Sequence, residues 1–374
     1  MRIQGAPSTA PSPIFELAAD GLTAIPGGTG NFIAFPSASS LSDGLVAFVG
    51  NGAGGQQGLY TRAVGAPPQE PPLRIVDTAT AIPAGSGNFI AFPSAPSLSG
   101  RRVAFVGSGS GRQQGVYARA LAGLSNRVLL APPQETLLVI ADTSTTIPGG
   151  SGNFIAFPGA PSLHGERVAF VGSGSNGQQG LYTRALTALP QGPPLRIADT
   201  ATAIPGGSGN FTGIGDVAFN EAGLVFLGTG SGGQAGIYNM RGGQLLKVIA
   251  LGESIQSKTI TGLNFSRDGL DAGGAVAFQA TFRDGSQGVY ALDVVPQPSE
   301  LRITDVSFFG NELRLSFPSS SGRSYAIESR ADLSAGQWSE VPGTTTISNG
   351  AAIELTVPIA LAQPQQFYRV KQLP

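Results

Sequence analysis

The feature that most constrains this chain is a short apolar run, VAFVG at residues 103–107, which a glycine-rich turn separates from a second run, QGVY at residues 114–117. The pattern occurs five times, and in every copy a tyrosine follows the central phenylalanine after twelve residues. The five pairs are Phe48 and Tyr60, Phe105 and Tyr117, Phe170 and Tyr182, Phe226 and Tyr238, and Phe278 and Tyr290. A period of this length is typical of a repeat architecture.

Each repeat contains four short segments that read as strands. Their cores are rich in Val, Ile, Phe and Tyr, and Gly, Pro, Ser or Asn residues bound them. No segment has a helical period over ten residues. In the second repeat the segments are NFIAFPSAPSL (88–98), VAFVG (103–107), GVYARA (115–120) and LLVIADT (137–143). The VAFVG segment is apolar on both faces, whereas Arg74, Arg196 and Lys247 interrupt the last segment of other repeats.

A sheet that is covered on both faces and meets water only at its last strand is typical of a blade in a β-propeller. We therefore predict an all-β fold with a five-bladed β-propeller over residues 14–296, after an N-terminal tail at 1–13. The strand-like run Ile14–Asp20 has no blade of its own, and we expect it to close the ring beside the fifth blade, near Tyr290. The predicted repeats lie near 21–77, 78–142, 143–199, 200–250 and 251–293.

The repeat pattern is lost after about residue 300. Roughly seven short segments with turn signals between them follow, and residues alternate between apolar and polar in Glu312–Phe317 and in Ala352–Val357. We predict a small β-sandwich at 300–374. The run Leu301–Asp305 resembles a fourth strand of the repeat, but Gln297–Ser299 reads as a linker and assigns that run to the second domain. We expect Trp338 to lie in its core.

The repeated order of Pro and Ser before a turn, then VAF, a glycine-rich turn and GxY resembles propeller repeats of the TolB and WD40-like class. It is also similar to tandem propeller repeats of secreted bacterial proteins, and the resemblance covers about residues 14–293. The stretch from SGRSYAIESRADL to QQFYRVKQLP resembles a β-sandwich module of exported proteins from Verrucomicrobia. The resemblance implies an extracellular or cell-surface location, although Met1–Pro13 has no apolar core of a signal peptide.

The composition argues against several classes of function. Charged residues make up 12% of the chain and the net charge is -1, with no basic stripe, so we expect no nucleic-acid partner. The chain has no cysteine, which excludes thiol catalysis, disulfides and Cys-ligated metals. No apolar stretch reaches the roughly 18 residues that a membrane helix needs, so we expect no membrane insertion.

An aspartate ends each fourth strand, and an asparagine follows it after eleven residues. The pairs are Asp20 and Asn31, Asp77 and Asn88, Asp142 and Asn153, and Asp199 and Asn210. Four aspartates at one level of a propeller predict a ligand-binding ring at one mouth of its channel, with Ca²⁺ as the one cofactor to consider. The alternative interpretation is that each aspartate caps its own turn through backbone N–H groups.

The remaining candidate residues break the symmetry of the repeats. Asp216 and Glu221 bring carboxylates into the fourth repeat, which indicates either a ligand-binding site there or the drift that is common in terminal repeats. His164 aligns with Ser42 and Ser99 at a turn, so we assign it no role in a catalytic triad or a zinc site. We identify no catalytic residue.

Three hypotheses follow from these observations. The first is a non-enzymatic exported module that binds a protein or a glycan at the propeller mouth. The second is a carbohydrate-binding or carbohydrate-active propeller with an acidic site at that mouth. The third is a scaffold that calcium stabilises.

Overall fold

The computed structural model describes residues 16–373 except 68–69, 122–123, 126–127, 130–135, 187–191, 242, 294–302, 311, 318, 320–322, 333–336, 349–351 and 359–364. Strands and turns make up almost all of the described part, and its helical residues are two 3-10 turns, Ala53–Gly55 and Ser231–Gly233. The described residues contain no helix with the length and apolarity to cross a membrane. The all-β prediction is therefore confirmed.

The chain divides into two compact units. The first consists of Met1–Asn239, Lys247–Ala272 and Ala277–Tyr290, and the second of Met240–Leu246, Gly273–Val276 and Ala291–Pro374. The first unit therefore holds most of the repeats. The second holds the whole region after the repeats, together with two short pieces of the fourth and fifth.

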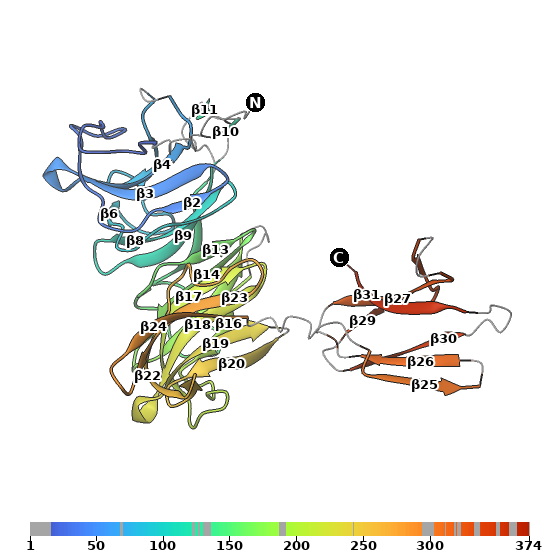
Figure 1. Ribbon diagram of the computed structural model, residues 1–374. Coiled ribbons are helices and arrows are strands. Elements are labelled where there is room, and N and C mark those ends of the chain that lie inside the picture. The colour runs from blue at the N-terminus through green and yellow to red at the C-terminus, as the bar shows by residue number, and fades with distance from the viewer. Residues whose placement is uncertain are drawn as a thin grey trace, which may run out of the picture. The chain divides into compact units, whose positions relative to one another are not determined.

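Each of the first three repeats forms one antiparallel sheet (Figure 1). Sheet 1 contains β1 (Phe32–Ala34), β2 (Ser40–Ser42), β3 (Leu45–Gly52), β4 (Gln57–Ala63) and β5 (Leu73–Asp77). Sheet 2 contains β6 (Phe89–Ala91), β7 (Ser97–Ser99), β8 (Arg102–Gly109), β9 (Gln114–Ala120) and β12 (Leu138–Asp142). Sheet 3 contains β13 (Ser162–His164), β14 (Arg167–Ser173), β15 (Gln179–Ala185) and β16 (Leu195–Asp199). The extra residues of the second repeat form a separate hairpin of β10 (Leu124–Ser125) and β11 (Val128–Leu129).

The fourth and fifth repeats also form one antiparallel sheet each, and the two sheets differ in their edge strands. Sheet 4 contains β17 (Phe211–Asn220), β18 (Gly223–Gly230), β19 (Ala235–Arg241) and β20 (Gln244–Ala250). Sheet 5 contains β21 (Ser254–Ile255), β22 (Lys258–Asn264), β23 (Ala275–Phe282) and β24 (Gln287–Asp293). The short β21 pairs with β22, so β24 is an edge strand and no described strand pairs with its outer side.

Consecutive sheets pack through unlike faces. The VAFVG strand of sheet 1 turns Ala47 and Val49 toward sheet 2, where they share one buried cluster with Phe89 and Phe105. Sheet 2 packs the corresponding Ala104 and Val106 against the aromatic side chains of sheet 3 in a second buried cluster, which repeats the same contact. Since small side chains on one face meet aromatic rings on the next, both faces of the VAFVG strand are buried, as predicted.

The glycine that ends the VAFVG run makes room for one of these rings. A Cβ atom on Gly107 would lie 2.5 Å from Cε1 of Phe89, which is closer than packed side chains approach one another. Phe89 in turn lies edge-on to Tyr117, with 5.0 Å between the ring centres. The repeated glycine is therefore a packing requirement of the first strand's phenylalanine.

The second unit contains the seven strands that the sequence predicts, arranged in two antiparallel sheets. Sheet 6 contains β25 (Asp305–Phe309), β26 (Glu312–Phe317) and β30 (Ile353–Pro358). Sheet 7 contains β27 (Ser324–Arg330), β28 (Ser339–Glu340), β29 (Thr346–Ile347) and β31 (Phe367–Gln372). Leu313 and Leu315 of sheet 6 share a buried cluster with Ile327 of sheet 7. The expectation that Trp338 lies in the core is wrong: it is half-buried outside this cluster, and the guanidinium of Arg369 lies 4.4 Å from its ring centre.

Candidate functional site

The four aspartates at the ends of the fourth strands each bond within their own turn. Oδ1 of Asp199 accepts hydrogen bonds from the Ala201 N–H at 3.0 Å and from the Thr202 hydroxyl at 2.8 Å. Asp20, Asp77 and Asp142 make the same pair of contacts two and three residues downstream. The hydrogen bond from Thr23 lowers the pKa of Asp20. These contacts are those of the turn-capping interpretation.

Two of the four aspartates are also buried beside a cation. Asp77 and Asp199 are each 2% exposed, and Oδ2 of each lies 2.8 Å from the guanidinium of Arg74 or Arg196. Asp20 and Asp142 are half-buried. The paired carboxylates therefore have little contact with solvent through which a ligand would approach.

The four asparagines lie at the other end of the same loops. Asn31, Asn88, Asn153 and Asn210 are exposed and form isolated antiparallel bridges with Ala24, Ala81, Thr146 and Ala203. They close each loop just before the buried phenylalanine of the next sheet. Among the described residues no three His, Asp or Glu side chains gather as a metal-binding group, and the calcium-stabilised scaffold stays a hypothesis.

Asp216 lies on β17, an edge strand of sheet 4, and Glu221 lies in the turn that follows it. The pairing of β17 with β18 shifts register between Ile214 and Val217, and this irregularity leaves the Asp216 side chain exposed. Oε2 of Glu221 lies 3.6 Å from Nδ1 of His164 at the end of β13. The structure thus brings Glu221 to His164 of the neighbouring sheet, and the ligand-binding role of both carboxylates stays a prediction.

Glutamine side chains connect neighbouring sheets, a role that the sequence analysis did not assign. Oε1 of Gln57 accepts the Phe92 N–H of sheet 2 at 2.6 Å, and Oε1 of Gln114 accepts the Phe157 N–H of sheet 3 at 2.7 Å. Gln179 repeats the contact to Ile214 of sheet 4 at 2.7 Å. The signal was present as the QG that precedes the tyrosine in every repeat except the fourth, but a single strand does not show which residue its glutamine contacts.

Serine hydroxyls on β2, β7 and β13 form a second series of contacts between sheets. The Ser40 hydroxyl accepts the Leu98 N–H at 2.9 Å, and the Ser97 hydroxyl accepts the Leu163 N–H at 2.9 Å. The Ser162 hydroxyl accepts the Phe219 N–H at 3.1 Å. Because hydroxyls with this role are already hydrogen-bonded to the backbone, they hold the sheets in register and are not placed as nucleophiles.

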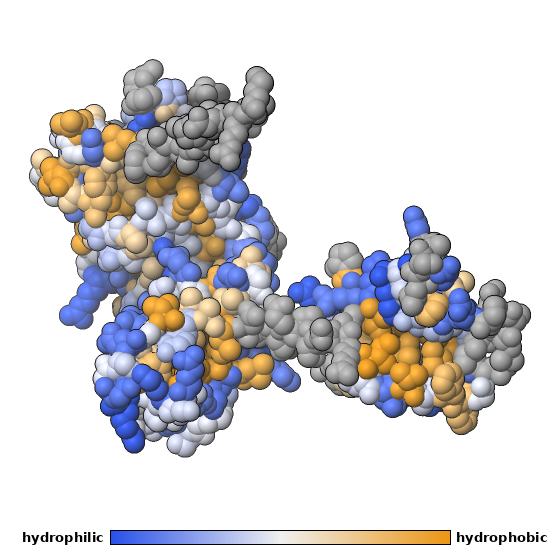
Figure 2. Space-filling model, in the orientation of Figure 1, coloured by the Kyte–Doolittle hydropathy of each residue, from blue (hydrophilic) through white to orange (hydrophobic). Residues whose placement is uncertain are grey.

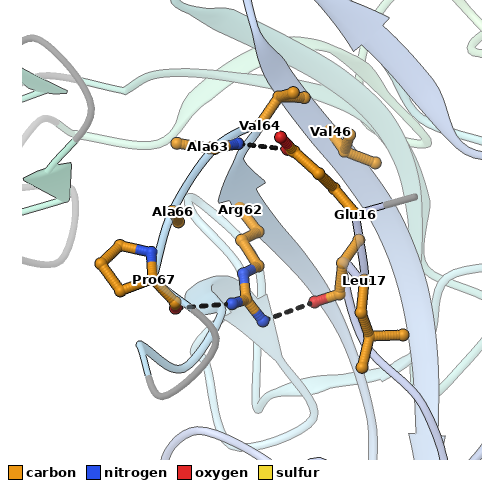
Figure 3. Close-up of a pocket in the computed structure, with 10 residues that line it drawn as sticks. Glu16, Leu17, Val46, Arg62, Ala63, Val64, Ala66 and Pro67 are labelled. Atoms are coloured by element: carbon orange, nitrogen blue, oxygen red, sulfur yellow. Dashed lines mark hydrogen bonds between the residues drawn. The ribbon is translucent and has the colours of Figure 1, made fainter. Parts of the chain in front are cut away.

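An arginine on each of β4, β9 and β15 donates to the segment that precedes its sheet in the chain. Arg119 donates to the Ile75 carbonyl of the preceding sheet, and Arg184 donates to the Ile140 carbonyl. Arg62, the equivalent residue of sheet 1, donates to the Ala18 carbonyl at 3.3 Å (Figure 3). Ile75, Ile140 and Ala18 all precede the turn aspartate by two residues. The N-terminal segment therefore contacts sheet 1 as a fourth strand contacts the sheet after it.

The N-terminal segment and sheet 1 enclose a cavity of about 410 Å³. Leu17, Val46 and Val64 supply apolar walls, and Arg62 also donates to the Pro67 carbonyl at 2.9 Å (Figure 3). Residues 16–20 have no strand assignment, and Ile14 and Phe15 lie outside the described residues. Pairing of this run with the fifth sheet stays a prediction.

Replacing Asp199 by alanine is expected to lower the free energy of unfolding by about 2–3 kcal/mol, because three hydrogen-bonding partners lose a buried carboxylate. Asn210→Ala, at the exposed end of the next loop, serves as the matched control and should cost less than about 0.5 kcal/mol. Urea unfolding measures both values. A melting temperature that rises with Ca²⁺ in the wild type, but not in Asp199→Ala, would instead support the calcium-stabilised scaffold.

Comparison with known proteins gives one family and a set of distant structures. Residues 125–302, just under half of the chain, match a family of unknown function (DUF7453). The comparison with curated proteins returned no match. The β-propeller domain of the Trilobed protease from Pyrococcus furiosus is 11% identical, with a TM-score of 0.41 over 91% of this chain and 98% of that one.

Two further solved structures are similar to this chain at low sequence identity. The SapL1 lectin, solved in complex with alpha methyl fucoside, is 8% identical, with a TM-score of 0.33 over 88% of this chain and 98% of that chain. The β-propeller domain of Cps50 (Swd1) from Myceliophteria thermophila is 12% identical, with a TM-score of 0.29 over 78% of this chain and 81% of that one. By sequence, the chain is similar over residues 125–302 to a family whose function is unknown.

Proposed function

We propose that this chain is a non-enzymatic binding module, exported to the cell surface or the extracellular space, and built on a five-bladed β-propeller with a C-terminal β-sandwich. One observation carries the proposal. The aspartates, glutamines and serines that recur in the first three repeats are used inside the fold, as turn caps and as contacts between sheets, whereas the isoleucine that recurs in the same repeats faces solvent. Binding through such a surface needs no nucleophile or general base.

The recurring isoleucines are Ile33, Ile90 and Ile155, which are 69%, 58% and 57% exposed. Each follows the buried phenylalanine of the NFIAF segment. Ile33 lies in β1 and Ile90 in β6, and the Ile155 N–H donates to the Ser173 carbonyl of β14. Neighbouring sheets pack side by side, so equivalent residues of sheets 1 to 3 lie at the same end of the unit, beside the loops between the aspartates and asparagines. Repeated exposed apolar residues mark an interaction surface, and here they support a protein partner or the apolar face of a glycan.

Two features support closure of the propeller by residues 14–20. Val289 of sheet 5 is 80% exposed, although its counterparts Leu59, Val116, Leu181 and Ile237 are each 0% exposed. Among the described residues, sheet 5 therefore has neither a neighbour on this face nor a strand beyond β24. Residues 16–20 already contact sheet 1 as a fourth strand of a preceding blade would. An experimental structure with residues 14–20 far from β24 would contradict this closure.

The binding surface is tested with the full chain against a phage-displayed peptide library and a glycan array. The triple variant Ile33→Ser, Ile90→Ser, Ile155→Ser should bind the selected peptides or glycans at least tenfold more weakly. This corresponds to a loss of about 1.4 kcal/mol in binding free energy. The matched control combines Leu41→Ser, Leu195→Ser and Leu246→Ser, three other exposed leucines, and should keep its affinity. Equal losses in both triple variants would contradict the proposed surface.

Glycan recognition at an acidic site is the second candidate, and the exposed Asp216 favours it. The register shift in β17 exposes this carboxylate where the first three repeats have the sequence FPS or FPG. A hydrolase panel separates the two candidates. Turnover of a glycan that Asp216→Asn abolishes, with melting unchanged, would end the non-enzymatic interpretation.

A further inference from the structure

Strand β25 (Asp305–Phe309) is an apolar sheet edge whose outer side has no described strand beside it. It pairs only with β26 in the three-stranded order β25-β26-β30, and all five of its residues are exposed. Phe308 is 71% exposed and Val306 is 52% exposed. Figure 2 shows apolar side chains gathered over the region of sheet 6. An edge strand of this kind leaves a row of N–H and C=O groups open to another strand.

The two apolar side chains of β25 extend the core face of sheet 6. Phe308 is the cross-strand partner of Leu313, and Val306 is the partner of Leu315. Both leucines are buried in the cluster shared with sheet 7. Because directly paired residues point to the same face of a sheet, Phe308 and Val306 lie on that face, at the edge that remains exposed.

Two charged side chains lie at β25 on the opposite face of sheet 6, Asp305 of β25 itself and Arg314 of β26. The guanidinium of Arg314 lies 5.0 Å from the ring centre of Phe309. Asp305, at the other end of the strand, points to the same face, and its carboxylate forms no ion pair with another described residue. On the side away from β25, Nη1 of Arg314 lies 3.5 Å from Oε1 of Glu354 on β30.

We propose that β25 pairs antiparallel with β25 of a second copy, about a two-fold axis at Ser307. In this register Val306 faces Phe308 of the second copy, and a β-branched residue opposite an aromatic ring is a favourable cross-strand pair. Asp305 faces Phe309 of the second copy, where the guanidinium of that copy's Arg314 lies. The edge is therefore complementary to itself in both shape and charge, as a two-fold interface requires.

Sedimentation velocity on the full chain, from about 1 to 100 µM, tests the pairing, because dimerisation follows mass action. The wild type should change from monomer to dimer over this range. Val306→Lys and Ser307→Pro should remain monomeric, since a charge or a missing N–H on an edge strand blocks pairing. Leu41→Lys, at an exposed position of the first unit, is the control and should dimerise as the wild type does. Unchanged melting temperatures show that each variant is folded.

Charge reversal tests the register. Asp305→Arg alone and Arg314→Glu alone should each raise the dimer dissociation constant at least tenfold, because each places like charges across the axis. An equimolar mixture of the two variants should regain dimer, since both new contacts then join opposite charges. A wild type that is monomeric throughout overturns the proposal. So does a dimer that both edge variants keep, or a mixture that fails to associate.

Discussion

The free energy of unfolding is expected to be lower at pH 11 than at pH 8. Tyr60 and Tyr182 should each contribute about 1.4 kcal/mol to this loss. Both side chains are fully buried. Burial raises the pKa of each hydroxyl to about 12, and the charges of Asp77 and Asp199 act in the same direction. Tyr117 and Tyr238 also have raised pKa values, chiefly through burial.

The sign follows from which state loses its protons first. An unfolded tyrosine has a pKa of about 10, so between pH 10 and 12 the unfolded chain ionises while Tyr60 and Tyr182 stay protonated in the folded protein. The stabilisation is complete below pH 10 and is lost as the pH rises through 12. Alkaline unfolding should therefore be steep, because several repeats contribute together.

Tyr182→Phe isolates one contribution. The Tyr182 hydroxyl has no hydrogen-bond partner among the described residues, so its removal should change stability little at pH 8. The variant should then lose about 1.4 kcal/mol less than the wild type between pH 8 and 11. Urea unfolding at both pH values measures the difference. Equal losses in the two proteins would show that Tyr182 ionises alike in both states.

Phe89→Ala is expected to lower the free energy of unfolding by about 3–5 kcal/mol. Phe89 is 1% exposed, and its ring lies 5.4 Å from Phe92, 6.2 Å from Phe105 and 5.0 Å from Tyr117, measured between ring centres. The same ring shares a buried cluster with Val49 of sheet 1. Removing it leaves a cavity inside sheet 2 and at its contact with sheet 1.

Ile90→Ala is the matched control, since it removes an apolar side chain from the next position of the same strand. Ile90 is largely exposed, so the control should cost less than about 1 kcal/mol. Circular dichroism in a urea series measures both variants. If the two changes cost the same, the aromatic cluster does not hold the repeat together.

The strands were predictable because the signals that specify them lie within each repeat, close together in the sequence. Alternation, β-branched residues and flanking turn residues act over a few positions, so the five repeated sheets and the seven later strands could be read from the chain. The turn-capping alternative for Asp77 and Asp199 was predictable for the same reason, since both partners lie within three residues. A ring of aspartates, in contrast, depends on how the sheets are arranged around one another, and no local sequence pattern predicts that arrangement.

One contact between distant residues left a trace in the sequence. Gly149 has a φ of 69°, and a Cβ atom there would lie 2.7 Å from Nη1 of Arg196. The second repeat has Ala84 at the first position and Val139 at the second. The added methyl group and the shortened side chain occur in the same repeat, so comparison of repeats could have paired these positions.

What the sequence by itself determined is the repeating unit: its strands, its turns and the aromatic residues of its core, all of which depend on neighbours along the chain. Only the tertiary structure decided how the units use their polar residues. Gln57 and Ser40 reach backbone groups of the next sheet, and Arg62 reaches the N-terminal segment. Those contacts join residues 35 to 58 positions apart, and their geometry exists only after the sheets have packed.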